Sequence, residues 1–350
     1  YSLYLVHWPI LVFTRYALLR DPSGWEIAMI VVASVVLATL SWWFVERPFR
    51  DPGWANRRQI LTAGGIAMAT IATFGVIGVQ AGGFPFRSPT LRAVASGSEG
   101  EWKQHICFLD GHDDLRGWSL DACTRAGSSG PKVLLWGDSF AAQYVPGFIE
   151  LGNDLAVQIV QYTFAGCPPL LDYESLARPG CHEFNAEALP LVRKAGIGTV
   201  ILCARWELHH RKGLGSLRET VEALRKSGVS VYVVGQSPEF AMDVQLLAYR
   251  SGVESARQVL AWTPQVDPRL NVEVSALASG ATFLDPMALL CDGGLCPYRT
   301  AGTFLYSDFG HLSQQGARLA VERLFPFLLL PGRTGYEGWP VAQKKADLAN

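Results

Sequence analysis

The chain has 350 residues, of which 49% are apolar and 17% are charged, whereas charged residues make up about a quarter of a typical soluble domain. Its 30 basic and 31 acidic side chains nearly cancel, so the composition offers no basic excess for binding nucleic acid. These values exclude a disordered chain and a coiled coil, and the length allows one to three domains. The chain begins at Tyr1 inside an apolar run, which predicts the C-terminal part of a longer protein.

Three apolar stretches precede residue 81, at residues 1–19, 25–45 and 60–79. Each is close to the roughly 20 residues that a helix needs to cross a bilayer, whereas buried helices of soluble cores usually have about 10–14. We therefore predict three transmembrane helices. The loop at residues 46–59 carries four arginines, so the positive-inside rule places this loop in the cytoplasm and everything after residue 80 outside it.

All seven cysteines lie beyond residue 100, in the part that this topology places outside. Six of them form pairs that are close in sequence: Cys107 with Cys123, Cys167 with Cys181, and Cys291 with Cys296. Proximity therefore predicts three disulfides, which are typical of an oxidising compartment. A zinc site at the last pair is the alternative, but no histidine stands there at ligand spacing. Cys203 remains as a buried free thiol within an apolar run.

The rest of the chain divides by composition. Residues 81–105 are rich in Gly, Ser and Pro and predict a linker, residues 106–330 predict one α/β domain, and residues 331–350 predict a tail. Short apolar runs predict five strands, at residues 132–136, 157–162, 199–203, 229–234 and 281–284. Helical patterns lie between and after them, near residues 140–152, 183–195, 216–227, 250–262 and 313–328. This alternation is typical of a parallel sheet covered on both faces, which binds ligands at the carboxyl ends of its strands.

The first candidate site residue is Ser139, in the sequence Trp136-Gly137-Asp138-Ser139-Phe140. This segment directly follows the first strand of the domain and opens a helix. A serine at such a turn is held at the carboxyl edge of the sheet, where a nucleophile and an oxyanion donor belong. The tripeptide alone is a weak signal, and its position strengthens it.

The second candidate is the sequence Ser307-Asp308-Phe309-Gly310-His311, just before the final helix. An aspartate and a histidine three residues apart allow one loop to supply both a general base and the group that orients it. His311 would accept the proton of Ser139, and Asp308 would select the tautomer of His311. A capping or surface histidine is the alternative for His311 taken by itself.

The order of these motifs resembles the SGNH (GDSL-like) hydrolase family, whose fold is a three-layer α/β domain. Ser139 matches the nucleophile of that family, His311 its base and Asp308 the third member of its triad. The front of the chain resembles the end of the acyltransferase-3 membrane family, in the stretches YSLYLVHWP at residues 1–9 and FVERPFR at residues 44–50. Together they resemble fused proteins that O-acetylate bacterial surface polysaccharides.

The resemblance also implies a glycine and an asparagine as further oxyanion donors. Gly166 matches the glycine, but Ala204-Arg205-Trp206-Glu207 stands where the asparagine is expected. Arg205 would either stabilise the oxyanion by its charge or shape an acceptor groove together with Trp206. Both residues are alternatively structural residues at the end of a strand.

The resemblance implies a membrane-embedded O-acetyltransferase in the bacterial inner membrane, with its SGNH-like domain on the periplasmic side. Acetyl-CoA is the expected acyl donor, acting through membrane helices that precede this chain, and no cofactor or metal is expected to bind the chain itself. The expected partners are the lipid bilayer and a cell-surface glycan, such as a lipopolysaccharide O-antigen or an exopolysaccharide. An extracytoplasmic carbohydrate esterase and a non-catalytic glycan-binding domain remain as alternatives, because a triad alone does not separate transfer from hydrolysis.

Overall fold

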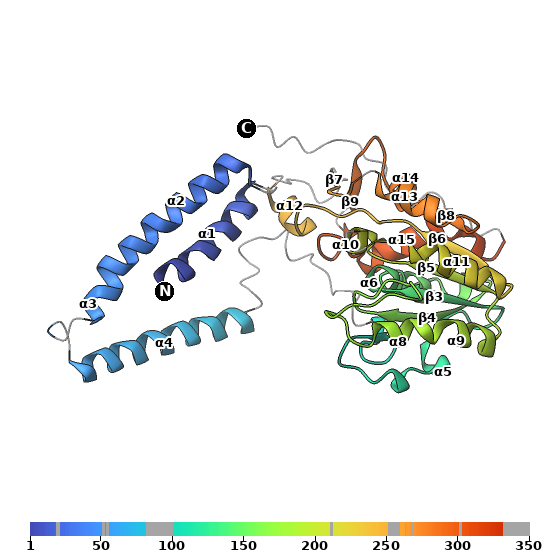
Figure 1. Cartoon of the computed structure of the whole chain (residues 1–350), viewed down its shortest axis with the longest axis horizontal. Coiled ribbons are helices and arrows are strands. Elements are labelled where there is room, and N and C mark those ends of the chain that lie inside the picture. The colour runs from blue at the N-terminus through green and yellow to red at the C-terminus, as the bar shows by residue number, and fades with distance from the viewer. Residues whose placement is uncertain are drawn as a thin grey trace. The chain divides into compact units, whose positions relative to one another are not determined.

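The structure is a computed structural model that divides into two compact units, Tyr1–Arg92 and Ala93–Asn350 (Figure 1). It describes residues 1–18, 22–50, 53, 56–81, 101–210, 213–250, 260–262, 264–267, 269–300 and 303–331. The predicted tail, apart from Pro331, and most of the predicted linker lie outside these residues.

The first unit consists of helices. They are α1 (Ser2–Leu18), α2 (Gly24–Ser41), a π-helical turn at Trp42–Glu46, α3 (Arg47–Arg50) and α4 (Arg57–Gln80). Two of the helices have capping boxes at their starts, in which Ser23 pairs with Glu26 and Asn56 pairs with Gln59. These side chains satisfy backbone groups that a helix start leaves without partners, which explains why the helices begin there.

Two helical segments among the described residues are long and apolar enough to cross a membrane, Gly24–Glu46 and Arg57–Gln80. Their most apolar windows are 11% and 0% buried, so they are not core helices of this unit. The third predicted span falls on α1, whose 17 described residues are fewer than the roughly 20 that a span usually needs, so it is not among these two segments. The apolar front of the chain thus provides two candidate spans beside a shorter helix.

The second unit is built on a seven-stranded sheet, in which β1, β4, β3, β5, β6 and β8 follow one another and all pair in parallel. A further strand, β2, pairs antiparallel with β4. The strands are β1 (Phe108–Leu109), β2 (Thr124–Ala126), β3 (Lys132–Gly137), β4 (Gln158–Phe164), β5 (Thr199–Cys203), β6 (Ser230–Val234) and β8 (Thr282–Leu284). A second, antiparallel sheet joins β7 (Leu260–Trp262), β9 (Cys296–Thr300) and β10 (Thr303–Phe304).

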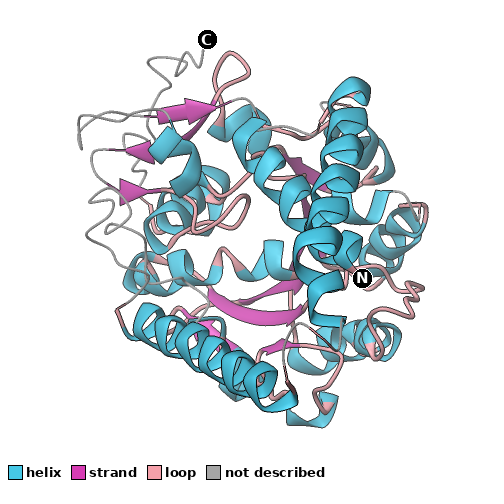
Figure 2. Cartoon of the chain, turned by 90° about the vertical axis from the view of Figure 1, so that its left-hand side faces the viewer, coloured by secondary structure: helices cyan, strands magenta, loops and turns pink. Residues whose placement is uncertain are grey.

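Helices alternate with the strands of the large sheet along the chain, and Figure 2 colours helices cyan and strands magenta. The helices are α5 (Leu120–Cys123), α6 (Ser139–Ala142), α7 (Val145–Glu150), α8 (Cys181–Ala186), α9 (Ala188–Ala195), α10 (Trp206–His210), α11 (Ser216–Lys226), α12 (Val244–Arg250), α13 (Leu270–Leu277), α14 (Pro286–Leu290) and α15 (Gln314–Leu324). Short 3₁₀ turns lie at Leu115–Gly117, Gly152–Asp154 and Pro326–Leu328.

Both faces of the sheet are covered, which explains why its strands read as apolar runs and not as alternating patterns. On β3, Leu134 and Trp136 belong to the core cluster that also contains α8, α9, α11 and α13. The alternate residue Leu135 points to the opposite face and is equally buried. The carboxyl ends of β3, β4, β5 and β6 therefore meet at one edge of a rigid scaffold.

All five predicted strands are present, but the prediction of about five was too few because β1 and β2 escaped it. β1 has two residues, and β2 contains the polar Thr124 and Arg125, so neither strand forms an apolar run, and both form by pairing with β4. The predicted helix at residues 250–262 is wrong at its end, where β7 pairs with β9. Residues 251–259 lie outside the described part of the chain.

The three predicted disulfides are confirmed: Cys107–Cys123, Cys167–Cys181 and Cys291–Cys296. Cys203 is a buried free thiol, as expected. The first disulfide ties the residues just before β1 to the end of α5. Trp102 lies a few residues before this disulfide, in the segment that the composition placed in the linker. Its side chain is 3% exposed, so it is part of this folded unit.

The close approach of β3 and β5 at their carboxyl ends generates a stability prediction. A Cβ atom at Gly137 would lie 1.7 Å from the carbonyl oxygen of Cys203. Gly137→Ala should therefore destabilise the domain by at least about 2 kcal/mol and lower its Tm by roughly 4–8 °C. The measurement is thermal unfolding of the full chain in detergent, followed by tryptophan fluorescence. Gly152→Ala is the matched control, because its Cβ would meet nothing within 4 Å; equal Tm values for the two variants would contradict this packing.

Candidate active site

Ser139 is the first residue of α6, directly after the turn that ends β3. Asp138 caps this helix, with its Oδ1 accepting the N–H of Phe140 at 2.8 Å. A short acidic side chain is favoured here because the first N–H groups of a helix have no partner within the helix. The hydroxyl of Ser139 therefore stands at the carboxyl edge of the sheet, where the sequence placed it.

The structure brings Ser139, His311 and Asp308 together, although 172 residues separate the first two. The Oγ of Ser139 lies 2.9 Å from Nε2 of His311, and Nδ1 of His311 lies 2.6 Å from Oδ2 of Asp308. With its proton on Nδ1, the imidazole donates to Asp308 and accepts the hydroxyl proton of Ser139. This is the arrangement of a nucleophile, a base and an orienting carboxylate.

The second oxygen of Asp308 shapes the loop itself. Its Oδ1 accepts the backbone N–H groups of Gly310 and His311, each at 2.7 Å. Burial on its own raises the pKa of Asp308, but these hydrogen bonds and the contact with His311 outweigh it and hold the pKa below its usual value. Asp308 thus stays ionised at neutral pH and can stabilise an imidazolium at His311.

A fully buried side chain, Gln143, joins the serine helix to the histidine loop. Its Oε1 accepts the N–H of Leu312 at 3.0 Å, and its Nε2 donates to the carbonyl of Phe140 at 3.0 Å. Three aromatic rings also surround the imidazole of His311, with centroids 5.0–6.3 Å away: Phe140, Trp102 and Phe309. The imidazole is consequently 18% exposed and is held from several sides.

Gly166, the predicted oxyanion donor, follows β4 in a turn with φ of +62°. A side chain would be strained at this φ, and a Cβ would also lie 2.6 Å from Nε of Arg178. Within the described part of the chain, the N–H groups of Gly166 and Ser139 have no acceptor. Two N–H groups at the carboxyl ends of adjacent strands are suited to stabilise an oxyanion.

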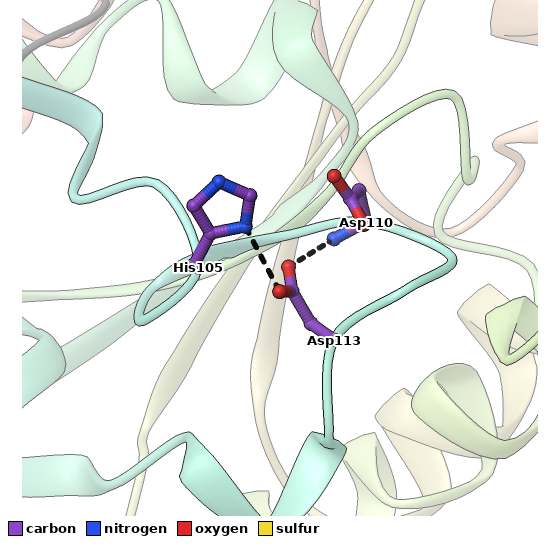
Figure 3. Close-up of side chains that lie close together, drawn as sticks. All are labelled: His105, Asp110 and Asp113. Atoms are coloured by element: carbon purple, nitrogen blue, oxygen red, sulfur yellow. Dashed lines mark hydrogen bonds and ion pairs between the residues drawn. The ribbon is translucent and has the colours of Figure 1, made fainter.

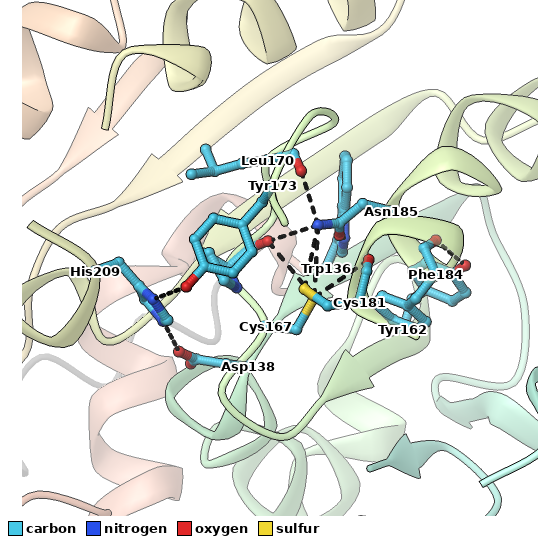
Figure 4. Close-up of a disulfide and its surroundings, with 11 residues drawn as sticks. Trp136, Asp138, Tyr162, Cys167, Leu170, Tyr173, Cys181, Phe184, Asn185 and His209 are labelled. Atoms are coloured by element: carbon cyan, nitrogen blue, oxygen red, sulfur yellow. Dashed lines mark hydrogen bonds and ion pairs between the residues drawn. A yellow bond between two sulfur atoms is a disulfide. The ribbon is translucent and has the colours of Figure 1, made fainter. Parts of the chain in front are cut away.

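The loop after Gly166 is anchored by a disulfide and by Asn185 (Figure 4). The bond Cys167–Cys181 ties the loop to α8. The amide nitrogen of Asn185 donates to the carbonyl of Leu170 at 2.8 Å, and its oxygen accepts the indole N–H of Trp136 at 3.0 Å. Asn185 is completely buried, so the loop beside Gly166 is fastened to both α8 and β3.

Arg205 occupies the position where the family resemblance calls for an asparagine. Its backbone N–H donates to Oδ2 of Asp138 at 2.9 Å. Its guanidinium donates from Nε and Nη2 to the two carboxylate oxygens of Glu239, at 2.9 and 2.6 Å. Burial on its own lowers the pKa of Arg205, but Glu239, Asp138 and Asp308 together raise it above its usual value. The guanidinium is therefore charged and bound to a carboxylate.

The structure assigns Trp206 to the core and not to an acceptor groove. Its side chain is fully buried, and its indole N–H donates to the carbonyl of Val234 at 2.8 Å. The alternative that the sequence left open, a structural residue at the end of a strand, describes this position. Because no surface of its ring is exposed, Trp206 cannot contact a bound sugar in this conformation.

Glu239 is a residue of the site that the sequence analysis missed. It lies in the loop that follows β6, whose carboxyl end stands beside that of β5 (Figure 1). The position of this loop at the ligand-binding edge of the sheet was the available signal. Its ion pair with Arg205 could not be predicted, because Arg205 lies 34 residues earlier in the chain.

His209 is buried at 2% exposure. Its Nε2 lies 3.4 Å from Oδ2 of Asp138, and the hydroxyl of Tyr173 lies 3.1 Å from its Nδ1 (Figure 4). Tyr173 belongs to the loop after Gly166, so Asp138, His209 and Tyr173 connect the turn of Ser139 to that loop.

Among the described residues, one group of side chains has the composition of a metal site, namely His105, Asp110 and Asp113 (Figure 3). Nδ1 of His105 lies 2.9 Å from Oδ1 of Asp113, and Oδ2 of Asp113 accepts the N–H of Asp110 at 2.7 Å. Both oxygens of Asp113 thus already have partners within the protein. The side chain of His105 is 65% exposed, and we assign no metal to this group.

Residues 106–326 match the protein family described as the SGNH domain fused to AT3 domains. Among solved structures, the periplasmic domain of a lipopolysaccharide acetyltransferase from Salmonella ser. Paratyphi A matches with 17% identity and a TM-score of 0.49, covering 60% of this chain and 87% of that one. A Bacteroides fragilis protein assigned as an acylhydrolase matches with 14% identity and a TM-score of 0.32, covering 53% and 83%. No curated protein matches the chain.

The two roles of the Asp308 carboxylate generate a prediction for Asp308→Asn. An amide cannot accept hydrogen bonds at both positions, so His311 should lose its productive tautomer and kcat for p-nitrophenyl acetate should fall roughly 10³–10⁴-fold. The rate at which a fluorophosphonate labels Ser139 should fall in parallel. A kcat that stays within about tenfold of the unmodified chain would contradict the assigned role.

The conformation of Gly166 generates a second prediction. Gly166→Ala should lower kcat roughly 10²–10³-fold, the effect of losing one oxyanion donor, because the new methyl group displaces the turn. Gly196→Ala is the matched control, since Gly196 has nearly the same φ, +63°, but open space around its Cβ. Both variants carry the same backbone strain, so a similar loss of kcat in both would contradict a special role for Gly166.

Proposed function

Because the chain belongs to the family of SGNH domains fused to AT3 domains, we propose that it is a membrane-anchored O-acyltransferase that moves an acetyl group onto hydroxyls of a cell-surface polysaccharide. The observation that carries this proposal is the hydrogen-bonded series Ser139–His311–Asp308, at 2.9 and 2.6 Å. The two candidate membrane spans and the three disulfides support an SGNH domain on the periplasmic side of the inner membrane.

In the first half of the proposed reaction, Oγ of Ser139 attacks the carbonyl carbon of the acyl donor while Nε2 of His311 takes the hydroxyl proton. The resulting oxyanion accepts hydrogen bonds from the N–H groups of Ser139 and Gly166. Asp308 stabilises the imidazolium that forms at His311. When the intermediate collapses, the bond to the leaving group breaks and His311 gives that group its proton, so Ser139 carries the acyl ester.

In the second half, the hydroxyl of an acceptor sugar takes the place of water. His311 removes its proton as its oxygen attacks the acyl carbon, and the same proton returns to Oγ of Ser139 when the ester breaks. The acyl source that we propose is acetyl-CoA, whose acetyl group AT3 helices would deliver across the membrane. We propose a lipopolysaccharide O-antigen or an exopolysaccharide as the acceptor.

The test of this function uses the full chain in membranes, an acetyl ester donor and a mixture of surface oligosaccharides. The unmodified chain should add an acetyl group to a sugar, as read by mass spectrometry, and Ser139→Ala should abolish the addition. The acceptor should also suppress the release of free acetate, because it competes with water for the same acyl-enzyme.

Two outcomes would contradict the transferase. Acetate release that depends on Ser139 but is unaffected by any acceptor would indicate a carbohydrate esterase. Failure of a serine-directed fluorophosphonate to label Ser139 would indicate a glycan-binding domain without catalysis.

A further inference from the structure

We propose that the ion pair between Arg205 and Glu239 is a positioning device, which holds the loop of Asp308 and His311 against the turn of Ser139. Neither residue needs to touch the substrate for this role. The inference rests on the proposed use of Ser139 and His311 in catalysis, and it adds two residues that act through them.

Glu239 supports the histidine loop from one side. A Cβ atom at Gly310 would lie 3.2 Å from Cγ of Glu239 and 3.2 Å from Cζ of Phe140. The aliphatic part of Glu239 therefore fills the space beside Gly310, which lies between Asp308 and His311 in the sequence. The next residue, Phe240, donates its N–H to the carbonyl of Phe309 at 2.7 Å, so the two loops are also joined through their backbones.

Arg205 contacts the same loop through the ring of Phe309. Its guanidinium carbon lies 4.9 Å from the ring centroid of Phe309, within the range of a cation–π contact. Its backbone N–H is held by Asp138, the residue before Ser139. Arg205 thus connects the serine turn directly to the loop that carries His311.

Glu239 is itself firmly anchored, which allows it to act as the fixed end of the device. Its Oε1 accepts a hydrogen bond from Nε2 of Gln236 at 2.8 Å. Gln236 is completely buried, and its backbone N–H donates to Oδ1 of Asn271 on α13 at 2.7 Å. The carboxylate of Glu239, with a side chain 8% exposed, is therefore connected to the body of the domain.

The charges explain why both partners are needed. The carboxylates of Asp138 and Asp308 lie close enough to Arg205 to raise its pKa. The loss of Arg205 would therefore leave the buried carboxylate of Glu239 without its cation and close to two other carboxylates. A buried ion that loses its partner is strongly unfavourable, and the surrounding loops are expected to move to reach solvent. Removing both charges together avoids this imbalance.

The experiment measures Arg205→Met, Glu239→Gln and the double variant in the full chain in detergent. Each single change should lower kcat for p-nitrophenyl acetate roughly 10–100-fold, the effect of displacing a catalytic group by about 1 Å. KM should stay within about twofold, since neither residue contacts this substrate. The fluorophosphonate labelling rate of Ser139 should fall with kcat, the double variant should be no slower than the worse single variant, and Arg205→Lys should restore part of the loss.

The control is Arg269→Met. Arg269 forms the same bidentate ion pair with Asp267, at 3.1 and 2.8 Å, but on the surface, with its side chain 88% exposed. This variant should leave kcat unchanged. Thermal unfolding of every variant separates a displaced site from a poorly folded domain, because the inference requires a loss of kcat in variants that remain folded at the assay temperature.

Three results would overturn the inference. They are single variants with unchanged kcat, losses that multiply in the double variant, and a rise in KM at constant kcat, which would make Arg205 a substrate-binding residue. Absence of labelling at Ser139 in the unmodified chain would overturn both this inference and the proposed function. A chain that is labelled at Ser139 but transfers nothing to a sugar would contradict the proposed function alone.

Discussion

The carboxylate of Asp138 is 1% exposed, and the loops of the candidate site are arranged around the hydrogen bonds that it accepts. A buried carboxylate is unfavourable unless donors surround it. Phe140 supplies one N–H from the serine helix and Arg205 supplies another from the loop after β5. His209 approaches the same carboxylate and links it, through Tyr173, to the loop after β4. One buried charge therefore sets the relative positions of the segments that carry the nucleophile, the oxyanion glycine and Arg205.

Three acidic side chains of the site, Asp138, Asp308 and Glu239, each have their own set of donors. Asp308 uses backbone N–H groups and His311, whereas Glu239 uses Arg205 and Gln236. Burial first, and the charge of Asp308 second, raise the pKa of Asp243. Separate donors keep the carboxylates apart and direct the imidazole of His311 towards Ser139.

Local sequence was enough to predict the strands β3, β4, β5, β6 and β8, and to single out three residues that the structure brings together, Ser139, Asp308 and His311. Ser139 stands at a strand-to-helix turn, and Asp308 and His311 share one turn, so each motif depends on neighbours in the chain. The disulfides followed from proximity for the same reason, since their cysteines are 5–16 residues apart.

What the sequence did not predict depends on contacts between distant segments. The strands β1 and β2 exist because β4 offers an edge. Trp102 follows a segment rich in Gly and Ser, which hid its contact with His311. The ion pair of Arg205 and Glu239 joins two loops that become neighbours only when β5 and β6 pair. A missing asparagine thus drew attention to Arg205, but the sequence could not show that a carboxylate from the next loop binds it.

Trapping the acyl-enzyme would show whether the acetyl group passes through Ser139. The full chain would be mixed with an acetyl donor, quenched within milliseconds and digested, and the acetylated peptide would be located by tandem mass spectrometry. We expect an acetyl group on Ser139 that disappears when an oligosaccharide acceptor is added and reappears as an ester on the sugar. An acetylated sugar formed without any acetyl group on Ser139, or formed equally well by Ser139→Ala, would contradict this expectation.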